Sequence, residues 1–170
     1  MDTTAQNQTS VVMPAASAVA TQEPNASRES LEDQNIFILL GVADGTDEEK
    51  ESFLDELQQV IWEDFIENDV KVLLTSDELA QLNTLLQQQY SSELEKQEKV
   101  VLFLEKLVPD LEEIMLEKAL ELKADLFRER LQSLQSYYGG NSGSLAAIEQ
   151  ARELMREDKW AAAAGMVNSL

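Results

Sequence analysis

The chain contains no cysteine and no histidine. Without cysteine it has no disulfide, no thiolate nucleophile and no zinc site of the cysteine type. Without histidine it lacks the commonest general base and the commonest ligand for transition metals. Chemistry is left to carboxylates, lysines and hydroxyl groups, so we expect a protein that is not an enzyme and that holds neither a cofactor nor a metal.

Positive charge is scarce, because 13 basic residues stand against 33 acidic ones and give a net charge of −20. Nucleic acids and anionic membrane surfaces both attract Lys and Arg, so we expect neither direct nucleic-acid binding nor membrane binding. No apolar run approaches the roughly 20 residues that span a bilayer. The segment Val11–Ala20 is weakly apolar and has no basic residue before it, so it does not fit a signal peptide, and the expected location is the cytoplasm.

Turn-forming residues are also few, with six glycines and three prolines in 170 residues, while leucine dominates the apolar residues. This composition favours helices over strands. The sequence therefore predicts an all-α fold: a small helical bundle of five or six helices over residues 33–138, preceded by a disordered tail over 1–32. A Gly-rich linker over 139–143 leads to a helical hairpin over 144–170, which we expect to be loosely tethered.

Helix starts are marked by capping residues. Asp33 is a candidate cap for a short helix that ends at Gly41, and an apolar bridge over 70–74 follows the next helix. Thr46 and Thr75 each precede a Glu by three residues, which is the capping-box pattern. Ser92 has the same spacing to Glu95, so residues 77–107 form either two helices or one continuous helix.

The helix predicted over 109–138, with Pro109 at its first position, has apolar residues on two stripes rather than one. One neighbouring helix cannot cover both stripes, so this helix needs at least two partners, within the chain or from another subunit. A homodimer through this helix is one possibility. Members of its second stripe, together with three aromatic residues from other segments, give the candidate interface residues: Trp62, Phe65, Phe127, Leu131, Leu134, Tyr138 and Trp160. Aromatic residues are enriched at interface hot spots and fill cores equally well.

Acidic residues concentrate over 31–70, where thirteen acids and one base give a net charge of −12. Residues 44–51 resemble half of a calcium-binding loop, but its first two ligand positions fall on Leu40 and Val42, so a capped helix start is the simpler interpretation. Four carboxylates over 63–69 could associate weakly with Mg²⁺. A solvated acidic face explains them as well.

Four segments of the run from Asn35 to Tyr138 carry a family likeness: 36–42, 47–49, 73–79 and 111–120. Through them the run resembles an uncharacterised family of small acidic helical proteins, a domain of unknown function from candidate-phyla (ultrasmall, uncultured) bacteria. The family carries no assigned activity, so it implies a helical fold and no site residues. Residues 151–167 separately resemble half of a tetratricopeptide-like helical pair, without the further copies that a solenoid needs.

The leading hypothesis is a non-enzymatic protein–protein interaction or assembly module whose protein partner is unknown and which uses apolar helix faces. The first alternative is an acidic mimic or inhibitor whose 31–70 segment occupies a basic site on a nucleic-acid-binding protein. The second is a Mg²⁺-dependent, carboxylate-based enzyme.

Overall fold

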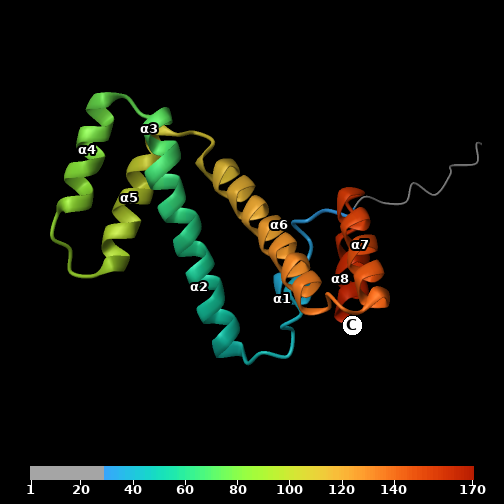
Figure 1. Cartoon of the computed structure of the whole chain (residues 1–170). Coiled ribbons are helices and arrows are strands. Elements are labelled where there is room, and N and C mark those ends of the chain that lie inside the picture. The colour runs from blue at the N-terminus through green and yellow to red at the C-terminus, as the bar shows by residue number, and fades with distance from the viewer. Residues whose placement is uncertain (1–28) are drawn as a thin grey trace, which may run out of the picture.

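The computed structural model of the chain describes residues 29–170, and within that range it contains helices and no strand. The expected all-α class is therefore confirmed. The two longest helices, α2 and α6, lie side by side through the middle, while α4 and α5 lie at one end and α7 and α8 at the other (Figure 1). The elements are α1 (Ile36–Leu40), α2 (Asp47–Asp64), a π-helical turn η1 (Phe65–Asp69), α3 (Val70–Leu73), α4 (Ser76–Gln87), α5 (Glu93–Leu107), α6 (Leu111–Tyr137), α7 (Ser142–Arg156) and α8 (Trp160–Asn168).

The cap of the short helix α1 lies two residues later than predicted. Asn35, not Asp33, caps it, because the Asn35 side chain accepts a hydrogen bond from the backbone N–H of Phe37 at 2.9 Å. The helix ends as predicted at Gly41, whose φ of 69° lies in the left-handed region that glycine favours.

Two distant side chains cover the carbonyl end of α1. Arg130 of α6 donates to the carbonyl oxygen of Leu39 at 2.5 Å, and Asn168 of α8 donates to that of Ile38 at 3.0 Å. The bond from Arg130 gives the Leu39 carbonyl a partner that a helix end does not supply, whereas the Ile38 carbonyl also accepts from the Gly41 N–H at 3.2 Å. The two side-chain bonds also fix this five-residue helix, too short to be stable alone, against the C-terminal half of the molecule.

The helix that begins at Thr46 runs further than the sequence indicated. We expected it to close at Asn68 and Asp69 and to be followed by a bridge that is either extended or a single turn. The single turn is present as α3, but η1 joins it to α2, so the chain stays helical to Leu73. The π-turn places residues five apart on one side of the helix. Phe65 and Val70 therefore both enter the core, with exposed fractions of 0% and 1%.

Residues 77–107 form two helices, which settles the alternative left open by the sequence. Thr75 caps α4 with a complete capping box, as Thr46 does for α2. The Ser92 hydroxyl accepts from the backbone N–H of Glu95 at 3.2 Å and so starts α5. The predicted start of α6 is corrected from Pro109 to Leu111, with Asp110 as the preceding residue.

The predicted single bundle over 33–138 is instead built around two separate cores. Core A joins α1, the C-terminal half of α6, α7 and α8; core B joins η1, α3, α4, α5 and the start of α6. The 27 residues of α6 extend about 40 Å, and its start packs in core B while its C-terminal half packs in core A. The helix thus meets two sets of neighbours within the chain, as predicted, although Leu116 stays 42% exposed.

The C-terminal hairpin is packed rather than loosely tethered. Trp160 lies in core A at 7% exposure, and its ring centroid is 6.3 Å from that of Phe127 on α6. Asn141 caps α7 and leaves Ser144 buried inside the helix, so the predicted linker reduces to a tight turn around Gly139 and Gly140. The large indole cannot be hidden by α7 and α8 alone, so it draws the hairpin onto α6.

Residues 29–32, which we assigned to a disordered tail, are attached to the C-terminal helices. Glu29 binds through its backbone N–H to the Asp158 carbonyl at 2.8 Å, and its carboxylate accepts from the Ala161 N–H at 2.5 Å. Lys123 donates to the carbonyl of Leu31 at 2.7 Å. Residues 1–28, the rest of the predicted tail, lie outside the described residues. Among the helices of residues 29–170, none has the length and apolar character needed to cross a bilayer.

Candidate protein-binding groove at Trp62

The structure divides the seven candidate interface residues into two groups. Four are core residues with exposed fractions of 7% or less: Phe65, Phe127, Leu131 and Trp160. The other three, Trp62, Leu134 and Tyr138, are partly exposed, and the last two pack against core A. Trp62 packs against core B and, like the other two, keeps part of its surface accessible; it is the partly exposed candidate that lines a hollow outside core A.

The Trp62 side chain is held in place by Phe65, three residues later in the chain. Trp62 belongs to the last turn of α2, and its ring centroid lies 6.1 Å from that of Phe65, with the ring planes inclined by 37°. Because Phe65 is fully buried in core B, the indole rests on a fixed base. A preorganised aromatic side chain loses little conformational entropy when a partner covers it.

Two hollows are lined by Trp62, and both have walls on α2 and α5. The first has a volume of about 360 Å³ and the second about 310 Å³. They share Gln59, Trp62 and Gln97, so they adjoin and form one groove. We call this the Trp62 groove; its remaining lining residues are Asp55, Gln58, Glu63, Ile66, Glu67, Leu86, Lys96, Val100, Val101 and Met115.

The groove has an apolar floor and an acidic wall. The floor includes Val100, Val101 and Met115. The wall formed by α2 and η1 carries the exposed carboxylates Asp55, Glu63 and Glu67. Gln59 donates to the Glu63 carboxylate at 2.8 Å and keeps it on the rim. Lys96 stands on the α5 wall.

A charge contact next to the groove fixes α2 and η1 against α6. Lys118 of α6 places its ammonium nitrogen 2.5 Å from an oxygen of Asp64 and 2.6 Å from one of Asp69. These hydrogen bonds raise the pKa of Lys118, and the bond from Lys118 lowers the pKa of Asp64. The sequence suggested a solvated acidic face over 63–69; instead, two of its four carboxylates hold a lysine. Among residues 29–170, no three acidic side chains are grouped closely enough to bind a metal ion.

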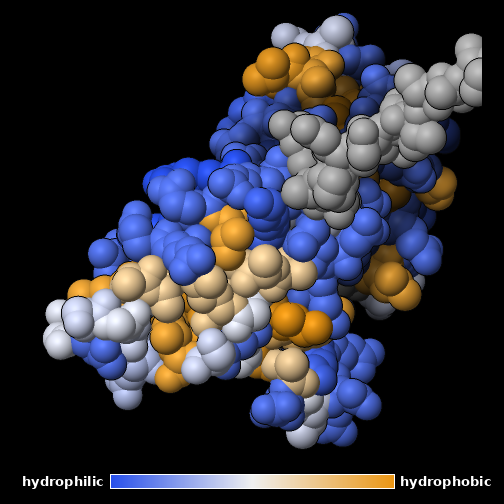
Figure 2. Space-filling model, turned by 90° about the vertical axis from the view of Figure 1, so that its right-hand side faces the viewer, coloured by the Kyte–Doolittle hydropathy of each residue, from blue (hydrophilic) through white to orange (hydrophobic). Residues whose placement is uncertain are grey.

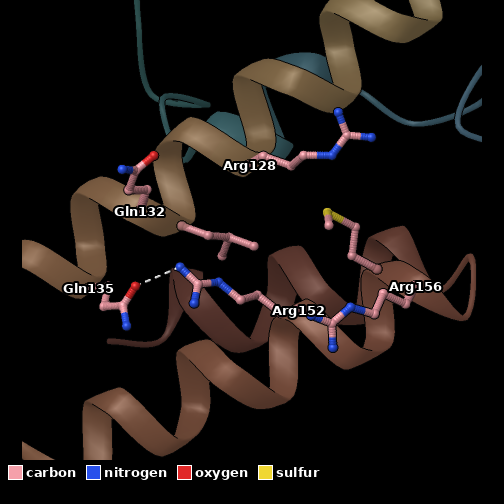
Figure 3. Close-up of a pocket in the computed structure, with 7 residues that line it drawn as sticks. Arg128, Gln132, Gln135, Arg152 and Arg156 are labelled. Atoms are coloured by element: carbon pink, nitrogen blue, oxygen red, sulfur yellow. Dashed lines mark hydrogen bonds between the residues drawn. The ribbon is translucent and has the colours of Figure 1, made fainter.

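A second groove, between α6 and α7, is rich in arginine. Arg128, Arg152 and Arg156 line it together with Gln132 and Gln135, and its volume is about 360 Å³ (Figure 3). Arg152 donates to the Gln135 side chain at 2.7 Å. Each arginine also pairs with a carboxylate three residues before it in its own helix. The groove is thus locally charge-balanced and brings together glutamines and arginines with no nucleophile.

Large apolar side chains are also exposed outside the groove, among them Val72, Leu94 and Leu116. On the face that carries the C-terminal helices, hydrophobic residues gather in several patches with hydrophilic residues between them (Figure 2). Another apolar hollow lies between α1 and the start of α2, where the rings of Phe37 and Phe53 have centroids 5.8 Å apart. It lacks a partly exposed tryptophan on a buried base, which is the feature that distinguishes the Trp62 groove.

Sequence reasoning identified Trp62 but missed the α5 side of the groove and the lysine that fixes it. Gln97 and Val101 follow the helical period of α5, yet nothing in the sequence pairs them with α2. Asp64 and Asp69 are five residues apart, and this spacing indicates that both can bind one cation, here Lys118, only once the π-turn is known. No protein-family model, curated protein or solved structure matches the chain, so the resemblance to the candidate-phyla family stays a prediction.

Proposed function

We propose that this protein is a non-enzymatic interaction module that binds a helical segment of a partner protein in the Trp62 groove. The observation that carries the proposal is the partly exposed indole, seated on a buried ring and lining two hollows with an apolar floor. Helix-in-groove recognition uses this arrangement, in which apolar anchors at helical spacing fill pockets beside a fixed aromatic residue.

The surface differs from the one that the sequence favoured. We first considered a dimer through the helix that is now α6, but Phe127 and Leu131 on that helix are buried by the chain itself. Leu134 and Tyr138 pack on the same core. An interaction through apolar helix faces thus has its best surface between α2 and α5.

The acidic mimic is the second candidate, and exposed carboxylates favour it. Most acidic side chains of α2 face solvent, among them Asp47, Glu48, Glu51 and Glu56. A mimic would bind through charge alone and would not need the indole. The two proposals therefore predict different effects of replacing Trp62 while the charges are kept. An interaction module would lose its partner, whereas an acidic mimic would still bind.

Site-specific photo-crosslinking in cells of the encoding organism tests the proposal. A photoreactive amino acid at Gln97, inside the groove, should yield an adduct with a discrete partner. The same amino acid at Leu102, which is on α5 but 55% exposed and outside the groove, is the matched control. We expect Trp62→Ala to abolish the Gln97 adduct. Equal adducts at both positions, or an adduct that survives Trp62→Ala, would overturn the proposal.

A further inference from the structure

Resting on the proposed function, we infer that the Trp62 groove selects a basic amphipathic helix, one with a leucine-type apolar face bordered by lysine or arginine. The inference follows from the juxtaposition of an apolar floor with a wall of carboxylates. Neither feature alone would identify the partner, because apolar floors accept any apolar helix face and surface carboxylates attract any cation.

The charge of the wall has one sign along its whole length. Asp55, Glu63 and Glu67 succeed one another along α2 and η1. The helix α2 itself contains eight acidic residues and one basic residue, a net charge of −7. A cationic helix laid beside α2 would therefore be attracted both by the three rim carboxylates and by the wider field of the helix.

The length of the groove suits a helix rather than a single side chain. From Asp55 to Glu67 the wall extends about 18 Å at 1.5 Å per residue, or roughly three turns. A partner helix of that length presents two or three apolar residues at spacings of three and four. The indole of Trp62 lines both hollows, so successive apolar residues of a partner helix can occupy one hollow each while both contact the indole.

A second copy of this chain suits the groove less well. Each copy carries a net charge of −20, and α2 or any comparably acidic helix would meet the acidic wall with the same sign of charge. Like charges brought together across an interface oppose association. Nucleic acid meets the same opposition from its phosphates.

Three fluorescently labelled 18-residue peptides test the inference against the full chain. The first is an amphipathic helix of leucine and lysine, the second has the same composition in an order without an apolar face, and the third replaces each lysine by glutamate. By fluorescence anisotropy, we expect the first to bind at least tenfold more tightly than the other two. Its affinity should fall several-fold when NaCl is raised from about 50 to about 300 mM.

Two sets of variants locate the binding. Trp62→Ala should weaken the first peptide tenfold or more, as loss of a hot-spot aromatic does. Glu63→Gln combined with Glu67→Gln should weaken it several-fold at low salt. Glu105→Gln with Glu117→Gln changes the net charge equally at exposed positions outside the groove and should leave binding unchanged. These exposed replacements keep the test valid even where Trp62→Ala alters folding.

Each contrary result has a definite meaning. Equal binding of the first two peptides would overturn the inference in favour of attraction by charge alone, as in an acidic mimic. Tight binding of the glutamate peptide, or concentration-dependent dimerisation lost in Trp62→Ala, would overturn it in favour of an acidic helix or a second copy. Absence of peptide binding alongside a Trp62-dependent crosslink from Gln97 would reject the basic helix and leave the proposed function standing. If neither peptide binding nor a Trp62-dependent crosslink is observed, the basic helix and the proposed function are both rejected.

Discussion

Lys118 and Asp69 meet across the contact between α6 and the π-turn, with 2.6 Å between the ammonium nitrogen and Oδ2. This oxygen is shielded from solvent, so removal of the lysine leaves a carboxylate charge with poor hydration. We predict that Lys118→Met lowers the free energy of unfolding more than Lys106→Met, which removes an exposed lysine from the last turn of α5. Urea unfolding followed by circular dichroism measures both. Equal losses would show that Lys118 is a surface charge of no special importance.

The contribution of Asp64 to stability should disappear in acid. The hydrogen bond from Lys118 lowers its pKa below 3.8 in the folded chain, so the unfolded chain takes up the proton first as the pH falls. The stabilisation is complete above about pH 3.8 and is lost as the pH falls through the lower folded pKa. We predict that the difference in urea midpoint between the parent and Asp64→Asn is constant at neutral pH and closes below that value. A difference that persists in acid would contradict the assignment.

Glu95 gives a direct spectroscopic test of the local charge network on α5. The hydrogen bonds from Lys99 and Ser91 lower its pKa to about 2. The Lys99 nitrogen also lies 5.1 Å from the centre of the Tyr90 ring. An NMR titration of the Glu95 carboxyl should give this low pKa in the parent, and Lys99→Met should raise it toward the ordinary value of 4.5. An unchanged pKa would mean that the pair does not persist in solution.

Two glycines should respond to alanine in opposite directions. Gly41 has a φ of 69°, and a Cβ there would overlap the guanidinium of Arg130, so Gly41→Ala should lower the free energy of unfolding by about 1–2 kcal/mol or more. Gly165 lies within α8 with open space around its Cα. Gly165→Ala should raise stability by about 0.5–1 kcal/mol. Thermal melts of the two variants against the parent decide this, and two changes of the same sign would refute it.

The contact between Phe127 and Trp160 should be the main attachment of the hairpin. Phe127 is fully buried, and Phe127→Ala should lower stability by about 3–5 kcal/mol. In hydrogen exchange followed by mass spectrometry, the variant should exchange faster than the parent in α1, α7 and α8. The exchange of α4 and α5 should change little, because core B does not include this residue. Uniform acceleration over all helices would indicate one cooperative core instead.

The local rules of helix formation were readable from the sequence, whereas the tertiary partners were not. Thr46, Thr75 and Ser92 start helices because each cap acts on a backbone N–H three residues away. The two stripes of the long helix correctly required two sets of neighbours. Their identity depends on contacts between segments far apart in the chain, such as that of Arg130 with the carbonyl of Leu39, and the helical period carries no signal for these.

The segments that were predicted wrongly share a physical cause, because in each of them the burial of apolar side chains outweighs the local sequence preference. The π-turn was missed because Asn68 and Asp69 have low helix propensity, and burial of Phe65 and Val70 outweighs that local preference. The hairpin was expected to be loose because a run of glycines suggested flexibility, and Trp160 in core A overrides it. For the candidate groove, the aromatic residue was identified, but the opposing wall on α5 depends on how α4 and α5 turn back toward α2.

Core A and core B share one continuous helix, α6, and this arrangement divides the molecule mechanically. A pull applied near residue 29 and the C-terminus would load core A while core B stayed unstressed, because residues 29–31 are attached to α6 and α8. The Trp62 groove adjoins core B, so a pull of this kind would not act on it directly.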